Sequence, residues 1–444
     1  MLVSRFMQQR LGTSSAIRQA FEKAEALKKA HGADNVFDFS IGNPSAPCPA
    51  GVRAALEDTA RKTAPELHGY MDSSGYADVR STIAASLARR FDTPYTASDI
   101  VMTAGAASAI NALMQTVLDP EDEVVAFLPC YPAYRVFAQN WGARLVEVPF
   151  DEETMLPDLA AFERALSPRT KLVIVNTPNN PSGLVYSAAM ADGIAGALFR
   201  AQRAFGHPIL LLSDEPYREL AYDGAQNPWW PAIYRNTAVV YSFSKSASIA
   251  GERIGYVALT PEMAERNALL AGIRRSLGDI GFVNAPATAQ RMAAACADDT
   301  VDIAYYDRNR RMLASSLASA GFDVVAGNGA FYLLMAAPDG NEQLLLDRLA
   351  AKRIVAVGGS DFGAPGYVRL SYCLPPEAVS RALPLFAQVA KEYGFSEQSP
   401  SAAPEPAAVP APPVTRVRVL PLPTAPGAVA ISPAAAPSAA ALAG

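Results

Sequence analysis

The sequence predicts an α/β protein with a large domain and a smaller α+β domain built from the N- and C-terminal segments. The large domain is expected to hold a mostly parallel seven-stranded sheet flanked by helices. Two observations favour this fold. Short apolar runs bounded by turn residues alternate with helical stretches, which is typical of parallel sheets. The chain of 444 residues also exceeds one compact core, so two lobes are expected.

Seven apolar runs account for the strands of the large domain. They are Ile100–Thr103, Val124–Leu128, Leu145–Val148, Leu172–Val175, Ile209–Leu212, Val239–Phe243 and Ile254–Leu259. The strands expected in the smaller domain are Phe322–Val325, Phe331–Met335 and Tyr367–Tyr372. Helical periodicity predicts one amphipathic helix over Ser15–His31 and another helix over Tyr305–Leu317, which leads into the smaller domain.

Composition along the chain suggests four regions. Residues 1–49 form an N-terminal segment expected to pack on the smaller domain or on a partner subunit. Residues 50–297 form the large domain and residues 298–397 the C-terminal small domain. Residues 398–444 are rich in Pro and Ala, so they have too little apolar bulk to offset the entropy of ordering and are expected to be disordered. Within them, Thr415–Leu422 could instead form a transient strand or serve as a docking peptide.

Bulk properties exclude several classes of protein. A net charge of −5 without a basic cluster argues against a nucleic-acid partner. No stretch approaches the ~20 apolar residues of a membrane helix, and the N-terminus lacks the apolar run of a signal peptide. Four widely spaced cysteines argue against a disulfide framework and favour a cytoplasmic location. The three histidines show no metal-ligand spacing, so no metal is expected.

Lys245 has the most informative position for function. It follows the apolar run Ala238–Tyr241, and Arg253 comes eight residues later. A lysine at the mouth of a buried strand loses hydration, which lowers its pKa and makes the free amine available as a nucleophile. Together with neighbouring hydroxyls and Arg253 it suits a ligand that carries an aldehyde and a phosphate, such as pyridoxal phosphate. The alternative is a surface lysine at a strand end.

Other polar or small residues follow three more of the predicted strands, and the carboxyl ends of parallel strands converge on one rim. Gly105 and Ala106 open a helical stretch whose backbone N–H groups could approach a phosphate, although a plain helix start is the alternative. Asp214 could keep a pyridine nitrogen protonated, or it could be a turn aspartate before Pro216.

Three further residues could contact the ring of such a cofactor. Asn180 and Tyr217 could hydrogen-bond its phenolic oxygen, although Asn-Pro is also an ordinary turn dipeptide. Tyr131 could stack on the face of the ring, or it could belong to the core.

In their order along the chain, these segments resemble the fold-type-I, class I/II pyridoxal-phosphate-dependent aminotransferases, the aspartate aminotransferase-like family. The resemblance covers about residues 35–395. It rests on the segments Ser40–Pro44, His68–Tyr70, Thr103–Ala107, Asn179–Gly183, Ser213–Tyr217, Ser242–Arg253 and Tyr367–Tyr372.

The resemblance implies that Lys245 forms the Schiff base with pyridoxal 5'-phosphate and later moves the substrate proton. It implies further catalytic roles for Asp214, on the pyridine nitrogen, and for Tyr217, which shares the phenolic oxygen with Asn180. Tyr70 would reach the phosphate of the neighbouring subunit, because members of the family share their sites across a homodimer. The remaining cofactor-binding positions are Gly105, Ala106, Ala107, Tyr131, Ser242, Ser244 and Arg253.

The implied reaction moves an amino group between an L-amino acid and a 2-oxo acid by a ping-pong mechanism. Arg369 would bind the substrate α-carboxylate as a bidentate pair, assisted by Asn180 and the backbone near Gly42. The alternative for Arg369 is a strand arginine in a surface ion pair. A second arginine for a distal carboxylate has no clear match, and Arg274 and Arg275 are candidates by position.

Two departures from the family pattern stand out. Tyr131 occupies the stacking position where the best-known aspartate enzymes have tryptophan, and Ala106 and Ala107 occupy a loop where a hydroxyl residue is common. Other enzymes share this scaffold, so a C–S β-lyase, a decarboxylase or a cyclising enzyme is an alternative. A cofactor-sensing transcription regulator is a third interpretation, but too few residues precede Ser40, and they lack the charge pattern of a helix-turn-helix.

Overall fold

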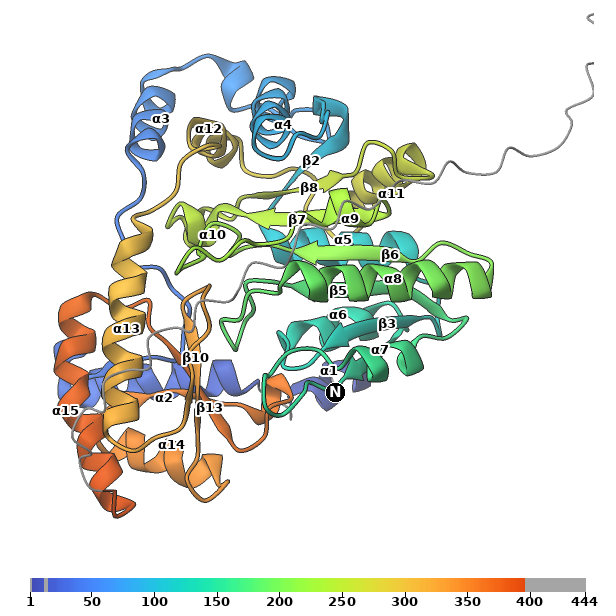
Figure 1. The fold of residues 1–444 in the computed structure, drawn as a ribbon. Helices are drawn as coiled ribbons and strands as arrows, with labels where there is room; N and C mark the ends of the chain where they lie inside the picture. The colour runs from blue at the N-terminus through green and yellow to red at the C-terminus, as the bar shows by residue number, and fades with distance from the viewer. Residues whose placement is uncertain (1, 12–14, 396–444) are drawn as a thin grey trace, which may run out of the picture. The chain divides into compact units, whose positions relative to one another are not determined.

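A seven-stranded sheet forms the centre of the large lobe in the computed structural model, which describes residues 2–11 and 15–395 (Figure 1). Strand β8 runs antiparallel to both its neighbours and all other neighbouring strands are parallel, which confirms the predicted mostly parallel sheet. In spatial order the strands are β2 (Ile100–Thr103), β8 (Gly255–Leu259), β7 (Thr237–Ser242), β6 (Leu210–Asp214), β5 (Thr170–Asn176), β3 (Glu123–Phe127) and β4 (Arg144–Val148).

The predicted strand boundaries differ from these by a few residues at most, and one difference bears on the site. The prediction that β7 includes Phe243 was wrong. The strand ends at Ser242, whose hydroxyl accepts a hydrogen bond from the backbone N–H of Ser244 at 3.2 Å and caps a short helix. Lys245 therefore lies on this helix, α10 (Phe243–Ser246), one turn beyond the strand.

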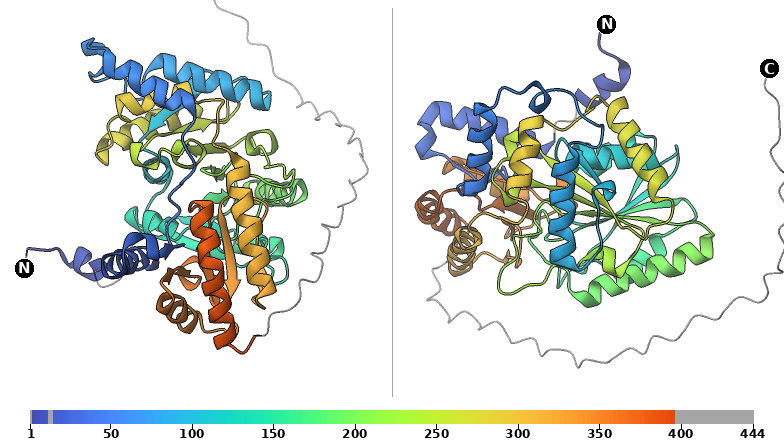
Figure 2. Two further views of the ribbon diagram at one scale, coloured as in Figure 1. Left: turned by 90° about the vertical axis from the view of Figure 1, so that its left-hand side faces the viewer. Right: turned by 90° about the horizontal axis from the view of Figure 1, so that it is seen from above.

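Helices cover both faces of the sheet, which explains why the inner strands are apolar throughout rather than alternating (Figures 1 and 2). One face packs against α5 (Ala106–Val117), α6 (Ala133–Asn140) and α11 (Arg266–Asp279). The other face is covered by α7 (Leu159–Ala165), α8 (Ala188–Phe205) and α9 (Trp230–Ile233), and near β2, β7 and β8 by α3 (Ala50–Arg61), α4 (Ala77–Phe91) and α12 (Ala287–Ala295).

The smaller lobe is built on a four-stranded antiparallel sheet. The predicted strands and the predicted helix of this lobe are present, shifted by at most two residues at their ends. In spatial order the strands are β12 (Val357–Gly358), β13 (Tyr367–Ser371), β10 (Tyr332–Ala336) and β9 (Val324–Val325). The helices around it are α13 (Ile303–Ser319), α14 (Glu342–Ala351) and α15 (Pro376–Glu392).

The N-terminal segment packs on this smaller lobe. After α1 (Arg5–Leu11), helix α2 (Ala16–His31) confirms the predicted helix except that Ser15 is its N-cap and not its first residue. One face of α2 contacts strands β11 (Ile354–Val355) and β12, and β1 (Phe37–Asp38) pairs with β11 in parallel. The predicted disordered region, residues 398–444, lies outside the described residues. No helix within the described ranges is long and apolar enough to cross a bilayer.

An ion pair is buried beneath the end of β6. The side chains of Arg218 and Glu215 are only 4% and 1% exposed, and the Nε of Arg218 donates to the carboxylate. Ser213 donates to the other carboxylate oxygen at 2.6 Å. The guanidinium carbon also lies 4.7 Å from the centre of the Tyr241 ring and 5.1 Å from that of Trp229. Because an unpaired charge is costly to bury, each partner depends on the other.

Replacing Glu215 by Gln should therefore leave a buried guanidinium without its counter-charge. We expect Glu215→Gln to lower the free energy of unfolding by about 3–5 kcal/mol, measured by urea denaturation. The matched control is Glu22→Gln, which breaks the exposed pair with Arg18 and should cost under about 1 kcal/mol. Equal shifts for the two variants would contradict the structural importance of the buried pair.

Candidate active site

A cavity of about 320 Å³ lies at the carboxyl ends of β5, β6 and β7. Parallel strands bring their ends to the same edge of the sheet, so residues far apart in sequence meet there. All predicted site residues except Gly105 and Tyr70 line this cavity, namely Gly42, Ala106, Ala107, Tyr131, Asn180, Asp214, Tyr217, Ser242, Ser244, Lys245, Arg253 and Arg369.

Lys245 lines this cavity and is half-buried. Its Nζ donates a hydrogen bond to the backbone carbonyl of Gly42 at 2.6 Å. Burial, reinforced by the positive charges of Arg253 and Arg369, lowers the pKa of Lys245 to about 8. At pH 7 about a tenth of the amine is therefore neutral, far more than for an ordinary lysine, which makes it a competent nucleophile and base. The alternative of a surface lysine is wrong.

Asp214 lies at the floor of the cavity and is only 5% exposed. Tyr134 donates its hydroxyl to Oδ2 at 2.5 Å, and the side-chain amide of Asn176 donates to the backbone carbonyl of Asp214 at 2.8 Å. Burial raises the pKa of Asp214 to about 7, although the bond from Tyr134 opposes the shift. Oδ1 has no hydrogen-bond partner among the described residues, so it is free to accept from a ligand.

An anion-binding corner forms where α5 meets α10. Arg253 donates from Nη1 to the hydroxyl of Ser244 at 3.5 Å, and the hydroxyls of Ser242 and Ser244 lie 2.8 Å apart. Gly105 precedes α5 with a φ of 80°, and a Cβ there would lie 2.7 Å from Nη2 of Arg253. Glycine is thus required both by the backbone angle and by the approach of the guanidinium. The helix N-terminus and the cation together suit a phosphate.

Arg369 enters the cavity from the smaller lobe, on β13, and is 2% exposed. Nη1 donates to Oδ1 of Asn180 at 3.1 Å and Nη2 donates to the backbone carbonyl of Ser40. Its Nε has no hydrogen-bond partner among the described residues. Burial of this side chain rules out the alternative of a surface ion pair. A buried guanidinium with an unused donor suits a carboxylate ligand.

Three polar residues of the site were not predicted from the sequence. Tyr134 and Asn176 hold Asp214, and Tyr332 lines the cavity with its hydroxyl 2.9 Å from that of Tyr217. Asn176 could have been found, because it is the last residue of β5. Tyr134 lies one helical turn after Tyr131, but that spacing carries no chemistry of its own. Nothing near Tyr332 in sequence signals its role.

Neither arginine proposed for a distal carboxylate lines the cavity. Arg275 forms an exposed ion pair with Asp279 at 2.9 Å, and Arg274 donates to the hydroxyl of Ser74 at 3.4 Å. Tyr70 is 98% exposed and lies outside the cavity. Any role for Tyr70 in a site would therefore depend on another subunit.

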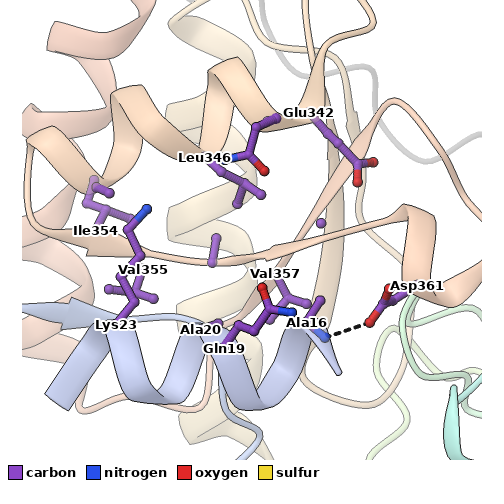
Figure 3. A pocket seen from close by; sticks show the side chains of 14 residues that line it. Ala16, Gln19, Ala20, Lys23, Glu342, Leu346, Ile354, Val355, Val357 and Asp361 are labelled. Atoms are coloured by element: carbon purple, nitrogen blue, oxygen red, sulfur yellow. Dashed lines mark hydrogen bonds between the residues drawn. The ribbon is translucent and has the colours of Figure 1, made fainter. Parts of the chain in front are cut away.

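A second cavity, of about 300 Å³, lies where α2 meets α14 and the strands β11 and β12 (Figure 3). At its edge Asp361 accepts a hydrogen bond from the backbone N–H of Ala16 at 2.6 Å, which is drawn dashed in Figure 3. This bond fixes the first turn of α2. The next residue, Ile17, lines the cavity that contains Lys245, so this hydrogen bond positions part of that cavity's wall.

Three independent observations show that the residues of the cavity containing Lys245 suit pyridoxal phosphate. The free Oδ1 of Asp214 suits a protonated pyridine nitrogen. The corner formed by Gly105, Arg253 and the start of α5 suits the phosphate. The partly neutral amine of Lys245 suits the aldehyde.

Comparison with known proteins gives consistent results. Residues 34–384 match the protein family described as Aminotransferase class I and II. Aspartate/prephenate aminotransferase of Thermus thermophilus is 30% identical over 373 residues, which cover 82% of this chain and 94% of the relative. An aminotransferase structure from Eubacterium rectale has a TM-score of 0.85 at 36% identity and covers 88% of this chain and 99% of its own. Aspartate aminotransferase from Thermus thermophilus, solved with maleate, has a TM-score of 0.77 at 27% identity, with coverage of 88% and 100%.

The lowered pKa of Lys245 predicts how the apoprotein takes up pyridoxal phosphate. The rate of covalent capture should rise roughly tenfold per pH unit below the pKa of about 8 and level off above it, because only the neutral amine attacks. Stopped-flow absorbance between about pH 6 and 10 measures this rate, and Lys245→Ala is the control without capture. A rate that keeps rising to pH 10 would indicate an ordinary lysine.

Proposed function

The chain belongs to the class I and II aminotransferase family, and on that premise we propose how its own residues transfer an amino group from an L-amino acid to a 2-oxo acid. It is a pyridoxal-phosphate-dependent aminotransferase. When bound, the cofactor supplies an electron sink for the electrons released at the substrate α-carbon. The named relatives favour amino transfer over the lyase, decarboxylase, cyclising and regulatory alternatives. The observation that carries the proposal is one cavity that holds Lys245, Asp214 and Arg369 together.

Lys245 is proposed to transfer the substrate proton, and Asp214 is proposed to keep the pyridine nitrogen protonated. The neutral Nζ of Lys245 is proposed to accept the proton from the substrate α-carbon and to release it on the way to the 2-oxo acid, and its lowered pKa suits both steps. Oδ1 of Asp214 would hold the proton of the pyridine nitrogen, while Tyr134 donates to Oδ2 and fixes it. A positive ring nitrogen would favour the ionised carboxylate and offset the effect of burial on its pKa.

Arg369 is proposed to bind the α-carboxylate of the substrate. Asn180 and the carbonyl of Ser40 each accept one hydrogen bond from the guanidinium and fix its orientation. The unpartnered Nε adds a donor for the carboxylate, and a guanidinium forms such charge-assisted bonds in a fixed geometry. The substrate is therefore held in one orientation relative to Lys245.

The remaining residues are proposed to hold the cofactor. Tyr217 and Asn180 would contact the phenolic oxygen, and Tyr131 would lie against the ring face. The phosphate would be held at the corner formed by the start of α5 and α10, by Gly105, Ala106, Ala107, Ser242, Ser244 and Arg253.

The walls of the cavity favour a neutral amino acid as the donor. Its positive side chains within the described residues are Lys245, Arg253 and Arg369, and each has a role above. The apolar side chains of Ile17 and Ile41 also line it. Within one chain a second carboxylate would therefore meet apolar surface in place of a cation, and burying it unpaired would be costly.

We further propose a homodimer in the cytoplasm. Tyr70 is almost fully exposed in the single chain, which leaves it available to the phosphate corner of a second copy. The four cysteines are free, with three of them buried, which is consistent with a reducing compartment.

Incubation with single amino acids and no 2-oxo acid tests the proposed function. We expect stoichiometric 2-oxo acid and accumulation of pyridoxamine phosphate, followed by absorbance and product analysis. Lys245→Ala should lose the visible band and nearly all turnover, because its covalent and proton-transfer roles vanish together. Release of ammonia, pyruvate or carbon dioxide without the amine form would instead assign the protein to the lyase or decarboxylase class.

Replacing Arg369 by Lys tests the substrate contact. We expect Arg369→Lys to weaken transition-state binding of every amino acid by about 1–3 kcal/mol, because a lysine cannot reproduce the bidentate pair. An amine without a carboxylate is the matched control, and its slow half-reaction should change little. For the wild type, neutral amino acids should compete well with aspartate and glutamate. A strong preference for the two acidic donors would contradict the proposed apolar wall.

A further inference from the structure

Two aromatic rings surround the guanidinium of Arg369. Its Cζ lies 4.7 Å from the ring centre of Tyr332 and 4.7 Å from that of Phe362. Tyr332 is 3% exposed and begins β10, the strand paired with β13, while Phe362 is fully buried and ends a short turn after β12. Cation–π attraction is stronger when water is excluded, so the two rings help to hold this buried guanidinium in place. Its Nη1 and Nη2 each donate one hydrogen bond, and its Nε has no partner among the described residues.

The hydroxyl of Tyr332 has a different neighbourhood from its ring. It lies 2.9 Å from the hydroxyl of Tyr217, and the two rings meet edge to face with centres 5.6 Å apart. It also crowds Gly42, because a Cβ there would come within 2.0 Å of the Tyr332 oxygen. The carbonyl of Gly42 in turn accepts the hydrogen bond of Lys245. One side chain thus contacts both the substrate-binding arginine and the residues around the cofactor.

We propose that Tyr332 is a positioning residue with two separable roles, one in its ring and one in its hydroxyl. The ring fixes the plane of the Arg369 guanidinium for the substrate carboxylate. The hydroxyl holds the hydroxyl of Tyr217 against the phenolic oxygen of the cofactor. Phe362 has no hydroxyl and performs only the first role. This inference rests on the proposed function of Arg369 and Tyr217.

The two roles have distinguishable consequences. Either hydroxyl of this pair can donate across the 2.9 Å contact; with the Tyr217 proton directed to the cofactor, Tyr332 is the donor, which polarises the Tyr217 hydroxyl and makes it a stronger donor. A stronger donor stabilises negative charge on the phenolic oxygen of the cofactor. It therefore favours the deprotonated form of the bound cofactor, in which the proton beside that oxygen has been lost and the oxygen is more negative. Loss of the Tyr332 hydroxyl should therefore raise the pH at which the bound cofactor changes colour. Loss of a ring beside Arg369 should instead weaken the binding of carboxylates.

The test compares holoenzymes of the wild type, Tyr332→Phe, Tyr332→Leu and Phe362→Leu. Two quantities are measured for each: the pKa of the colour change by absorbance, and the Kd of 3-phenylpropionate, a carboxylate without an amino group. Tyr332→Phe should raise the pKa by about half a unit and leave the Kd within about twofold. Phe362→Leu should raise the Kd roughly three- to tenfold and leave the pKa unchanged. Tyr332→Leu should show both changes.

If the pKa of the colour change in Tyr332→Phe equals that of the wild type, the role of the hydroxyl is overturned. If the Kd of 3-phenylpropionate is unchanged in both leucine variants, the role of the rings is overturned. Phe362→Met and Tyr332→Met, whose unbranched side chains adapt to the space left by a ring, take the place of a leucine variant that fails to fold. A wild-type protein that neither binds pyridoxal phosphate nor converts amino acids would overturn the proposed function itself. The wild-type protein alone tests the proposed function, whereas the variants test the roles of Tyr332 and Phe362. Failure of one can therefore be told apart from failure of the other.

Discussion

Exclusion of water from ionisable groups at one edge of the sheet is the constraint on which this site depends. The same shielding lowers the pKa of Lys245 to about 8 and raises that of Asp214 to about 7. Such groups are costly to bury alone, so each has a fixed hydrogen-bond partner on the protein. Oδ1 of Asp214 and Nε of Arg369 have no hydrogen-bond partner among the described residues, and a cofactor and a substrate would satisfy them. Binding of the cofactor and the substrate would therefore be favoured by the hydrogen bonds that these two buried atoms gain.

The site also joins the two lobes. The amine of Lys245, beyond β7 in the large lobe, bonds to the carbonyl of Gly42 in the N-terminal segment. Arg369, on β13 of the smaller lobe, bonds to Asn180 of the large lobe at 3.1 Å. Because both hydrogen bonds cross from one lobe to the other, the relative placement of the lobes and the geometry of catalysis are determined together. A covered sheet supplies the rigidity, since its strands are buried on both faces.

Much of this arrangement could be predicted from the sequence, for identifiable reasons. Buried parallel strands leave continuous apolar runs, and unusual chemistry directly after such runs drew attention to Lys245 and Asp214. Arg369 followed from the resemblance to a family and not from its charge. Tyr332 was missed because it belongs to a run that indicates only a core strand, and its partner Tyr217 lies 115 positions away. The strand end at Phe243 was misplaced because a side-chain cap at Ser242 decides it.

The adjacency of Asp361 and Phe362 ties together two parts of the pocket. Asp361 anchors the first turn of α2, which delivers Ile17 to the cavity wall, and Phe362 lies against Arg369. The residues proposed to face the substrate side chain and its carboxylate are therefore linked through one short turn. In directed evolution, substitutions at these two regions would be epistatic, so that a new side-chain specificity would be reached by paired changes rather than by single steps.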